Sequence, residues 1–497
     1  MSPKRLNVIT LGIMLSLFLA SMEGTVVATA MPTIVGQLGG LSIYSWVFSI
    51  YLLTSTTTVP IYGKLSDLYG RKLVYTASMV LFVAGSVLCS LAQTMDQLII
   101  FRGIQGLGAG GVLPLAFTII GEIFDLEQRA RMQGLFSGVW GVSSVIGPLI
   151  GGFLVDQVSW HWVFLINVIP GSLAVILVWF AWQSITPVRT KKVSVDYAGA
   201  GLLTVAALAL LLGLDQLGTL LSWGLLIGFV LLTALLLWVE HRAPDPMLPL
   251  HLFNDRLFVV SLLHGVFAGW AMFGSLSYVP LFVQAVLGTS ATQAGITLTP
   301  MSLAWTFASI LGGRLLLKMG YRTLSLFGML LLCAGTFLMT TISPASSQML
   351  IMVFLSLMGV GMGLSIPAFL IAVQSTVRKQ DLGVATSTVQ FSRSIGGTLG
   401  VSVLGAVLSS GLASRLITAG IDPATVSLDS LIDPMAAAAG TSAMSGPLRD
   451  ALSGSIASLF ITASVAAVLG LAVVAFAPGG RIAQLMENKL VKDSPGS

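Results

Sequence analysis

Fourteen apolar runs, each about as long as a membrane-crossing helix, constrain this chain more than any other feature of its sequence. A helix needs about 20 mostly apolar residues to span the hydrocarbon core of a bilayer. Only 9% of the 497 residues are charged, whereas a soluble globular domain carries about 25%. We therefore predict an all-α, polytopic membrane protein. The predicted spans lie near 8–30, 43–63, 73–93, 97–121, 133–155, 162–184, 197–214, 218–239, 258–282, 292–317, 323–343, 348–373, 384–411 and 453–477.

The distribution of lysine and arginine supports this count and orients the chain. Basic residues concentrate in the cytoplasmic loops of membrane proteins. If the N-terminus is inside, the inner connections carry nearly all of them, and the outside loops carry only Arg415 and Arg449. Both of these lie in one long polar outside loop, 412–452. The pattern predicts fourteen transmembrane helices with both termini in the cytoplasm.

Two short loops of similar sequence indicate an internal repeat. One reads GKLSDLYGRK over residues 63–72 and the other GRLLLKMGYR over residues 313–322, an offset of 250 residues. Such repeats are typical of secondary transporters, which bind substrate between the repeats. The offset is too long for two six-helix halves alone, so we predict two six-helix bundles with pseudo-two-fold symmetry and two inserted central helices. The predicted units are an N-terminal bundle (1–190), an insert (191–242), a C-terminal bundle (243–480) that includes the outside loop, and a cytoplasmic tail (481–497).

Three charged residues lie well inside predicted spans, where a charge is costly and needs a physical reason. At 1.5 Å per residue, Glu23 lies roughly 22 Å along the first span from the inside, and Arg102 lies roughly 8 Å in from the outside. These depths coincide in a hydrocarbon core about 30 Å thick, so we expect the two side chains to face each other. Such a pair suits reversible proton binding, because burial raises the pKa of a carboxylate whereas a nearby guanidinium lowers it. The alternative is a static ion pair that fixes the packing of the helices. Arg393 either reaches towards the cytoplasmic interface or pairs with an inner gate.

Several other classes of protein lack support in the sequence. There is no Gly-x-x-x-x-Gly-Lys-Ser/Thr sequence to bind phosphates, so ATP is not the expected energy source. The four histidines and two cysteines are scattered, and no metal site is predicted. Basic tracts with interleaved aromatic residues, which nucleic-acid binding needs, are also missing. We therefore expect no enzyme, no nucleic-acid partner and no cofactor, with a proton gradient as the energy source.

The loop at 63–72 resembles the signature loop of the major facilitator superfamily, and twelve core helices plus two central ones resemble its fourteen-helix drug:proton antiporter family. Four further stretches resemble motifs of that branch. They are MEGTVVATAMP (22–32), LIIFRGIQGLGAGG (98–111), GVWGVSSVIGPLIGG (138–152) and WHWVFLINVIPG (160–171). Two positions depart from the family pattern: Glu23 stands where Asp is usual, and Leu317 stands where the second loop would carry an acid.

The resemblance implies a role in coupling for the two charges of the first half. Glu23 would carry the proton, and Arg102 would modulate its binding. The glycine-rich fifth span, bent at a proline, belongs to exporters in this family and is thought to prevent leak. The corresponding residues here are Gly141, Gly147, Pro148, Gly151 and Gly152.

The signature loop is expected to form a gate on the cytoplasmic side. Asp67 would pair with Arg71 or cap the positive N-terminal end of a neighbouring helix. Gly63 and Gly70 would allow a tight turn and a close approach of helices. A solvated turn acid is the alternative for Asp67.

By analogy with the fold, the spans at 8–30, 97–121, 258–282 and 348–373 would line the substrate cavity. Methionine and aromatic side chains make adaptable surfaces that suit varied apolar cations, although they are common in any lipid-facing stretch. The candidate lining residues are His264, Trp270, Met272, Phe273, Tyr278, Met358, Met362, Phe369 and Gln374.

Together these features predict proton-coupled efflux of hydrophobic, often cationic drugs or dyes from the cytoplasm by alternating access. The alternative is a dedicated proton-coupled exporter of a single lipid, antibiotic or metabolite. The expected partners are these small molecules, protons and the lipid bilayer, and the expected location is the inner (plasma) membrane of a bacterium. The sequence indicates neither the substrate nor whether a periplasmic adaptor is needed.

Overall fold

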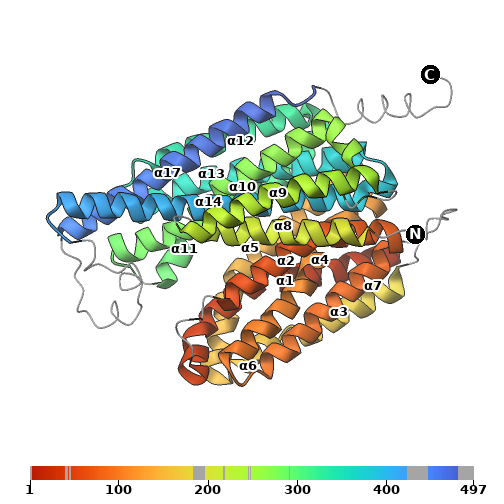
Figure 1. Cartoon of the computed structure of the whole chain (residues 1–497), viewed down its shortest axis with the longest axis horizontal. Coiled ribbons are helices and arrows are strands. Elements are labelled where there is room, and N and C mark those ends of the chain that lie inside the picture. Colours follow the sequence, from red (N-terminus) through yellow and green to blue (C-terminus); the bar gives the residue numbers. More distant parts are fainter. Residues whose placement is uncertain are drawn as a thin grey trace.

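The computed structural model describes residues 3–39, 43, 46–182, 196–215, 219–243, 246, 248–289, 291–422 and 446–479. Every regular element in these ranges is helical, which confirms the predicted all-α class. The helices form two groups that lie side by side (Figure 1).

The first group contains the helices before residue 182. Within it, α1 packs on α5 and α7, while α4 packs on α2 and α3. The helices are α1 (Pro3–Leu38), α2 (Trp46–Tyr69), α3 (Arg71–Ser90), α4 (Met95–Ile123), α5 (Leu126–Gln157), α6 (His161–Leu165) and α7 (Val168–Ala181).

The predicted span at 162–184 is interrupted rather than continuous. Its first part, α6, ends at Leu165, and α7 begins at Val168. Pro170 has no amide hydrogen, and a proline ring clashes with the carbonyl four residues earlier. The break at Ile166 and Asn167 follows, and it places the polar Asn167 inside an otherwise apolar span.

The second group contains the helices after residue 250. Here α13 packs on α11 and α12, and α10 packs on α14 and α17. The elements are η2 (Leu250–Asn254), α10 (Arg256–Leu281) with a π turn η3 (Phe282–Val286), α11 (Ala291–Met319), α12 (Tyr321–Met339), α13 (Gln348–Thr376), η4 (Lys379–Asp381), α14 (Leu382–Thr418) and α17 (Gly446–Ala475).

The predicted outside loop at 412–452 is shorter at both ends than expected. The apolar face of α14 continues to Thr418, and α17 begins at Gly446. Residues 423–445 of this loop, and the predicted tail at 481–497, lie outside the described residues.

Between the two groups, α8 (Tyr197–Asp215) and α9 (Leu220–Arg242) pack against each other as a hairpin. Only α8 makes extensive further contacts, with α2 and α14. It lies along the junction of the two groups (Figure 1). The predicted division of the chain at 190, 242 and 480 remains a prediction.

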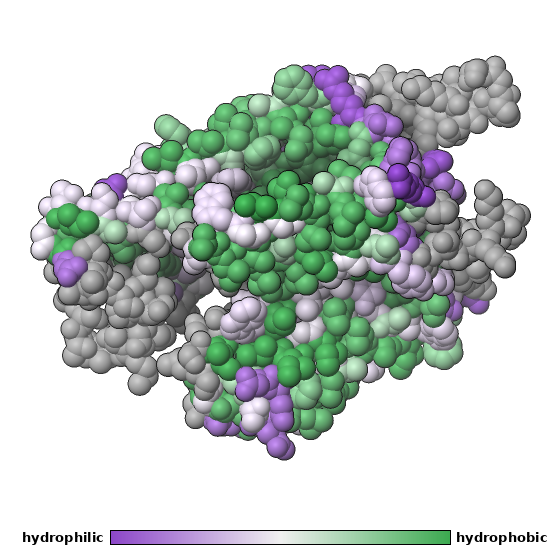
Figure 2. All heavy atoms as spheres, in the orientation of Figure 1, coloured by the Kyte–Doolittle hydropathy of each residue, from purple (hydrophilic) through white to green (hydrophobic). Residues whose placement is uncertain are grey.

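Twelve of the described helical segments are long and apolar enough to cross a membrane, and apolar residues cover most of the face seen in Figure 2. Helices α2 and α5 occupy two further predicted spans but are not among the twelve. The Ser/Thr run at 54–58 lowers the mean hydropathy of α2, and several side chains of α5 lie outside the described residues. The count of fourteen spans and the cytoplasmic termini therefore remain predictions.

The internal repeat is visible in the backbone. Gly70, before α3, has φ 90°, and Gly320, before α12, has φ 83°, a region that favours glycine. Both helices also bury the same face, 250 residues apart. The shared buried positions are 71, 74, 75, 78, 79, 82, 85, 86 and 89 in α3, and 321, 324, 325, 328, 329, 332, 335, 336 and 339 in α12.

Candidate functional site

A buried ion pair joins α1 to α4. Nη1 of Arg102 donates to Oε1 of Glu23 at 2.5 Å, and each residue is 1% exposed. Burying a charge costs free energy because it loses its hydration, so Glu23 and Arg102 stabilise each other only through close contact. The prediction that these two side chains face each other is confirmed.

Two amide side chains complete the surroundings of the carboxylate, and sequence reasoning missed both. Gln105 donates to Oε1 of Glu23 at 2.9 Å, and Asn167 donates to Oε2 at 2.7 Å. Gln105 also accepts from Arg102 at 2.7 Å. Two features of the sequence could have pointed to these residues. Gln105 lies one turn after Arg102 on the same helix face, and Asn167 lies close to Pro170, which interrupts the helix. We call Glu23, Arg102, Gln105 and Asn167 the Glu23 cluster.

The arginine of the Glu23 cluster has further partners on α2. Its Nε donates to the carbonyl of Val47 at 3.2 Å. The guanidinium carbon lies 4.1 Å from the centre of the Tyr51 ring, a cation–π arrangement. Arg102 is thus held by α1, α2 and its own helix, so a change in the charge of Glu23 would alter the forces on several helices at once.

Close backbone packing brings Gln105 to this position. A Cβ atom at Gly85 of α3 would lie 2.5 Å from Cα of Gln105, so only glycine permits this approach. Small residues at helix contacts allow such packing in membranes. The geometry of the site therefore depends on a glycine of a helix that carries none of its charges.

A second polar site links the two groups of helices. Oδ1 of Asp67 accepts from the amide of Gly383 at 3.0 Å, and Oδ2 accepts from the amide of Val384 at 2.8 Å. These amides are at the start of α14, where a helix has unsatisfied N–H groups and a partial positive charge. Arg71 donates to Oδ1 at 2.6 Å. The two expected arrangements of Asp67, pairing with Arg71 and capping a neighbouring helix, occur together.

We call Asp67, Arg71, Gly383 and Val384 the α2–α14 latch. Arg71 extends it, because Nη2 also donates to the carbonyl of Lys379 at 2.9 Å and Nε lies 2.9 Å from Oε2 of Glu122. The arginine therefore contacts α2, α4 and the segment before α14.

Two further features define the environment of the latch. A Cβ atom at Gly63 would lie 2.8 Å from the carbonyl of Gly383, so α2 and α14 meet backbone to backbone. Asp67 lies beyond the predicted span at 43–63, and burial raises its pKa to about 7 although Arg71 and the amides of Val384 and Gly383 act to lower it. The acid is thus poised to change charge near neutral pH.

The glycines of α5 contact different neighbours. A Cβ atom at Gly141 would lie 3.1 Å from the Thr306 hydroxyl of α11, while one at Gly147 would lie 3.3 Å from Met22 of α1. Gly151 is buried, and a Cβ atom at Gly152 would meet nothing within 4 Å. The side chain of Pro148 lies outside the described residues, and its role remains a prediction.

The predicted cavity residues separate into two sets. Met272, Met358 and Met362 are buried in the packed interior of the second group, with Met358 against Gly335 of α12. Tyr278 donates to the carbonyl of Val401 at 3.0 Å, which ties α10 to α14.

The remaining candidates lie where α10, α13 and α14 meet. The rings of His264 and Phe369 are 4.7 Å apart, and Phe273 and Trp270 lie against glycines of α14, Gly397 and Gly400. Gln374 donates to the carbonyl of Phe117 at 3.1 Å, from the second group to the first. Among the residues the structure describes, no group of three or more His, Cys, Asp or Glu side chains is placed to hold a metal ion.

Comparison with known proteins adds independent information. Residues 13–401 match the family described as Major Facilitator Superfamily. The chain is 41% identical over 463 residues to the multidrug transporter protein MdtP of Bacillus subtilis, covering 92% of this chain and 84% of that one. It is 36% identical to multidrug resistance protein 3 of the same organism, covering 95% of each.

Solved structures show the same fold at low sequence identity. The human organic anion transporter MFSD10 has a TM-score of 0.65 at 14% identity, with 95% of this chain and 100% of that chain covered. The proton:xylose symporter XylE has a TM-score of 0.62 at 14% identity, with 94% and 95% covered.

Proposed function

The chain belongs to the major facilitator superfamily, and we propose that it exports small hydrophobic compounds, cationic ones among them, in exchange for protons. It is a multi-pass membrane protein, and we place it in the inner membrane of a bacterium. The names of the two Bacillus relatives support drug efflux. The observation that carries the coupling is the carboxylate of Glu23, buried in the bundle with a guanidinium and two amides as its donors.

The coupling follows from the charge balance of the Glu23 cluster. A proton on Glu23 removes the negative charge that compensates Arg102, and a buried unpaired guanidinium is costly. Arg102 is then favoured in another position, where it reaches water or a different acceptor. Because Arg102 also bonds Val47 of α2, its movement changes how α1, α2 and α4 pack.

The α2–α14 latch supplies the second element of the cycle. It holds the two bundles together at the end of α2 next to Gly70, which is the predicted cytoplasmic side. Figure 2 shows a hollow between the bundles towards the opposite end of the molecule. Opening the latch while the opposite end closes would expose the interior to the other side, as alternating access requires.

Transport by purified protein tests the proposal. Proteoliposomes with an imposed pH gradient and a clamped membrane potential would be assayed for ethidium movement, using wild type, Glu23→Gln and Asp96→Asn. Asp96 is an exposed acid in the first turn of α4 and serves as the matched control. We expect gradient-driven transport by wild type and Asp96→Asn, and little by Glu23→Gln.

Two outcomes would oppose the proposal in different ways. Equal gradient-driven transport by Glu23→Gln and wild type would show that Glu23 is structural. If wild type moves neither ethidium nor a panel of unrelated dyes, export of varied hydrophobic compounds is wrong, and a dedicated exporter of one class replaces it.

A further inference from the structure

Arg393 is a guanidinium inside the second bundle that forms no ion pair with a described carboxylate. It lies about 16 Å along α14 from Leu382, at 1.5 Å per residue. Residues 256–380 and 382–421 contain no Asp or Glu. A buried charge of this kind demands compensation.

The face of α14 that carries Arg393 is directed to the interior between the bundles. Thr386 precedes it by seven residues, which is two helical turns, so both lie on one face. The Thr386 hydroxyl accepts from Gln374 of α13 at 3.4 Å, and the same amide group donates to Phe117 of α4 in the first bundle. Arg393 is therefore two turns farther along the face that meets both bundles, and the residue is only partly buried.

Two ring nitrogens close to this face also lack hydrogen-bond partners within the described structure. They are Nε2 of His264 and Nε1 of Trp270, both buried and both on α10. The adjoining Gly265 packs against the backbone of α14 at this level, since a Cβ atom there would lie 2.5 Å from the Ser392 hydroxyl and 3.4 Å from the Arg393 amide nitrogen. Buried polar groups are normally satisfied. The region therefore combines a positive charge with two unused ring nitrogens.

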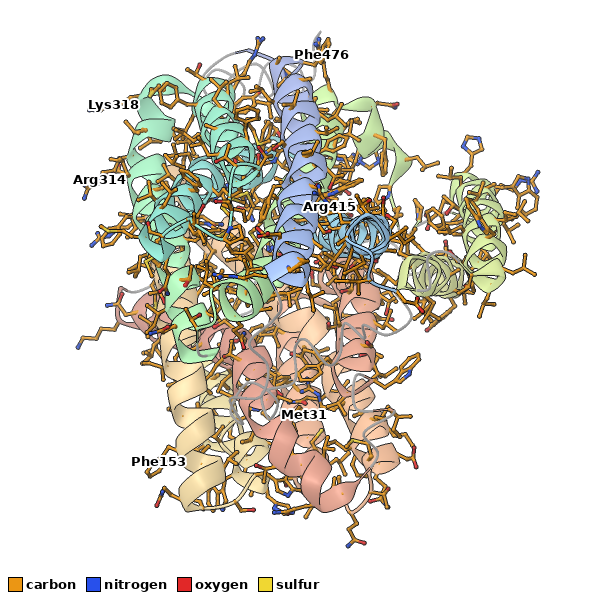
Figure 3. The ribbon with its side chains drawn as sticks, turned by 90° about the vertical axis from the view of Figure 1, so that its left-hand side faces the viewer. Met31, Phe153, Arg314, Lys318, Arg415 and Phe476 are labelled. Atoms are coloured by element: carbon orange, nitrogen blue, oxygen red, sulfur yellow. The ribbon has the colours of Figure 1, made fainter. Side chains whose placement is uncertain are left out.

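Neither of the two roles expected for Arg393 fits its position. Arg314 and Lys318 project outwards from α11 (Figure 3), as basic residues do when they reach an interface, whereas Arg393 is on the interior face. Pairing with an inner gate also fails, because the acids of that region are already bound. Asp381 bonds Arg378 at 2.9 Å and His251 at 3.2 Å, and Asp67 is bound in the latch.

We propose that Arg393 binds an acidic group of the transported compound, a carboxylate carried on an aromatic or other apolar frame. The planar guanidinium suits a bidentate bond to a carboxylate, and the Nε1–H of Trp270 is an available further donor. Phe273 and Trp270 lie against Gly397 and Gly400, about one and two turns farther along α14, and would supply apolar surface for the rest of the compound. The inference rests on the proposed export function and adds that amphipathic acids are preferred over their esters.

Matched probes test this preference in the intact protein. Tetramethylrhodamine and its methyl ester share one chromophore and differ in a carboxylate. Their binding to purified protein in nanodiscs would be followed by fluorescence anisotropy, and their gradient-driven export by proteoliposomes would be measured in parallel. We expect wild type to bind the acid about tenfold more tightly than the ester, which corresponds to one strong charge-assisted bond. Equal or weaker binding of the acid by wild type overturns the inference.

Variants then locate the preference. Arg393→Gln should bind acid and ester equally, while Arg393→Lys should keep a preference for the acid. A preference that persists in Arg393→Gln assigns the carboxylate to another residue and overturns the inference. Should Arg393→Gln not fold, Arg393→Met removes the charge with a side chain better suited to an apolar interior. If wild type exports neither probe, the proposed export function is contradicted. The binding measurements test only the preference for the acid, so the two failures can be told apart.

Discussion

Asp67 in α2 and Gly383 at the start of α14 are 316 positions apart in the chain, yet Oδ1 of Asp67 accepts the amide of Gly383 at 3.0 Å. The carboxylate joins the two bundles through backbone amides rather than through a side chain. Such a contact depends on the position of a whole helix end. It is therefore made or lost as the two bundles move relative to each other.

Removal of this carboxylate should open the α2–α14 latch. In Asp67→Ala the amides of Gly383 and Val384 lose their acceptor, and we expect the closed population to fall about tenfold or more, since a buried donor left without a partner costs about 1–3 kcal/mol. Spin labels at positions 69 and 380, with Cys89 and Cys333 replaced by alanine, would report the separation of the helix ends. Leu317→Ala at the equivalent repeat position is the control. Equal changes in both variants would contradict the assignment.

The latch should also respond to pH. Burial raises the pKa of Asp67 to about 7 in the closed arrangement, whereas an exposed aspartate has a pKa of about 3.9. The closed arrangement thus binds the proton more tightly, so a fall in pH from about 7 towards about 4 should favour closing, with little change above about 8. The same spin-label distances measured across this range check the sign. Asp67→Asn should show a flat response; a slope like that of wild type would assign the titration elsewhere.

Asn167 should contribute to the stability of the protein, although it lies in a short break between two helices. In Asn167→Leu the carboxylate of Glu23 loses its donor at 2.7 Å, and we expect a loss of about 1 kcal/mol, seen as a lower Tm in detergent. Asn167→Asp should be worse, because it places a second carboxylate beside the first. Ser90→Ala, whose hydroxyl bonds only its own helix at Val87, should change little. A Tm for Asn167→Leu equal to that of wild type would show that the bond is dispensable.

The glycine-rich helix α5 offers a matched pair of substitutions. A methyl group at Gly147 would crowd Thr25 and Met22 of α1, whereas one at Gly152 would meet nothing within 4 Å. Overpacking costs about 1–3 kcal/mol, so Gly147→Ala should lower both Tm and export. Gly152→Ala should leave both unchanged. The reverse order would show that the glycines act through backbone flexibility and not through helix contact.

The two sites differ in how much of their geometry could be predicted from the sequence. The pairing of Glu23 with Arg102 was predictable because helix rise and bilayer thickness turn two sequence positions into two depths. Asn167 was not, because its access to Glu23 depends on the break at Pro170 and on the rotation of three helices. For Asp67 the capping role was predictable, but the choice of α14 as the partner was not.

The sequence by itself determined the helical class, the places of the long helices and the repeat, because the apolar pattern and the glycine positions act over one helix or one turn. The tertiary structure alone decided which polar groups meet. The amides of Gly383 and Val384 reach Asp67 only because helices distant in the chain pack at defined rotations. The same rotations place Arg393 on the interior face of α14. Local residue preferences do not specify these rotations, since each results from the contacts of several helices together.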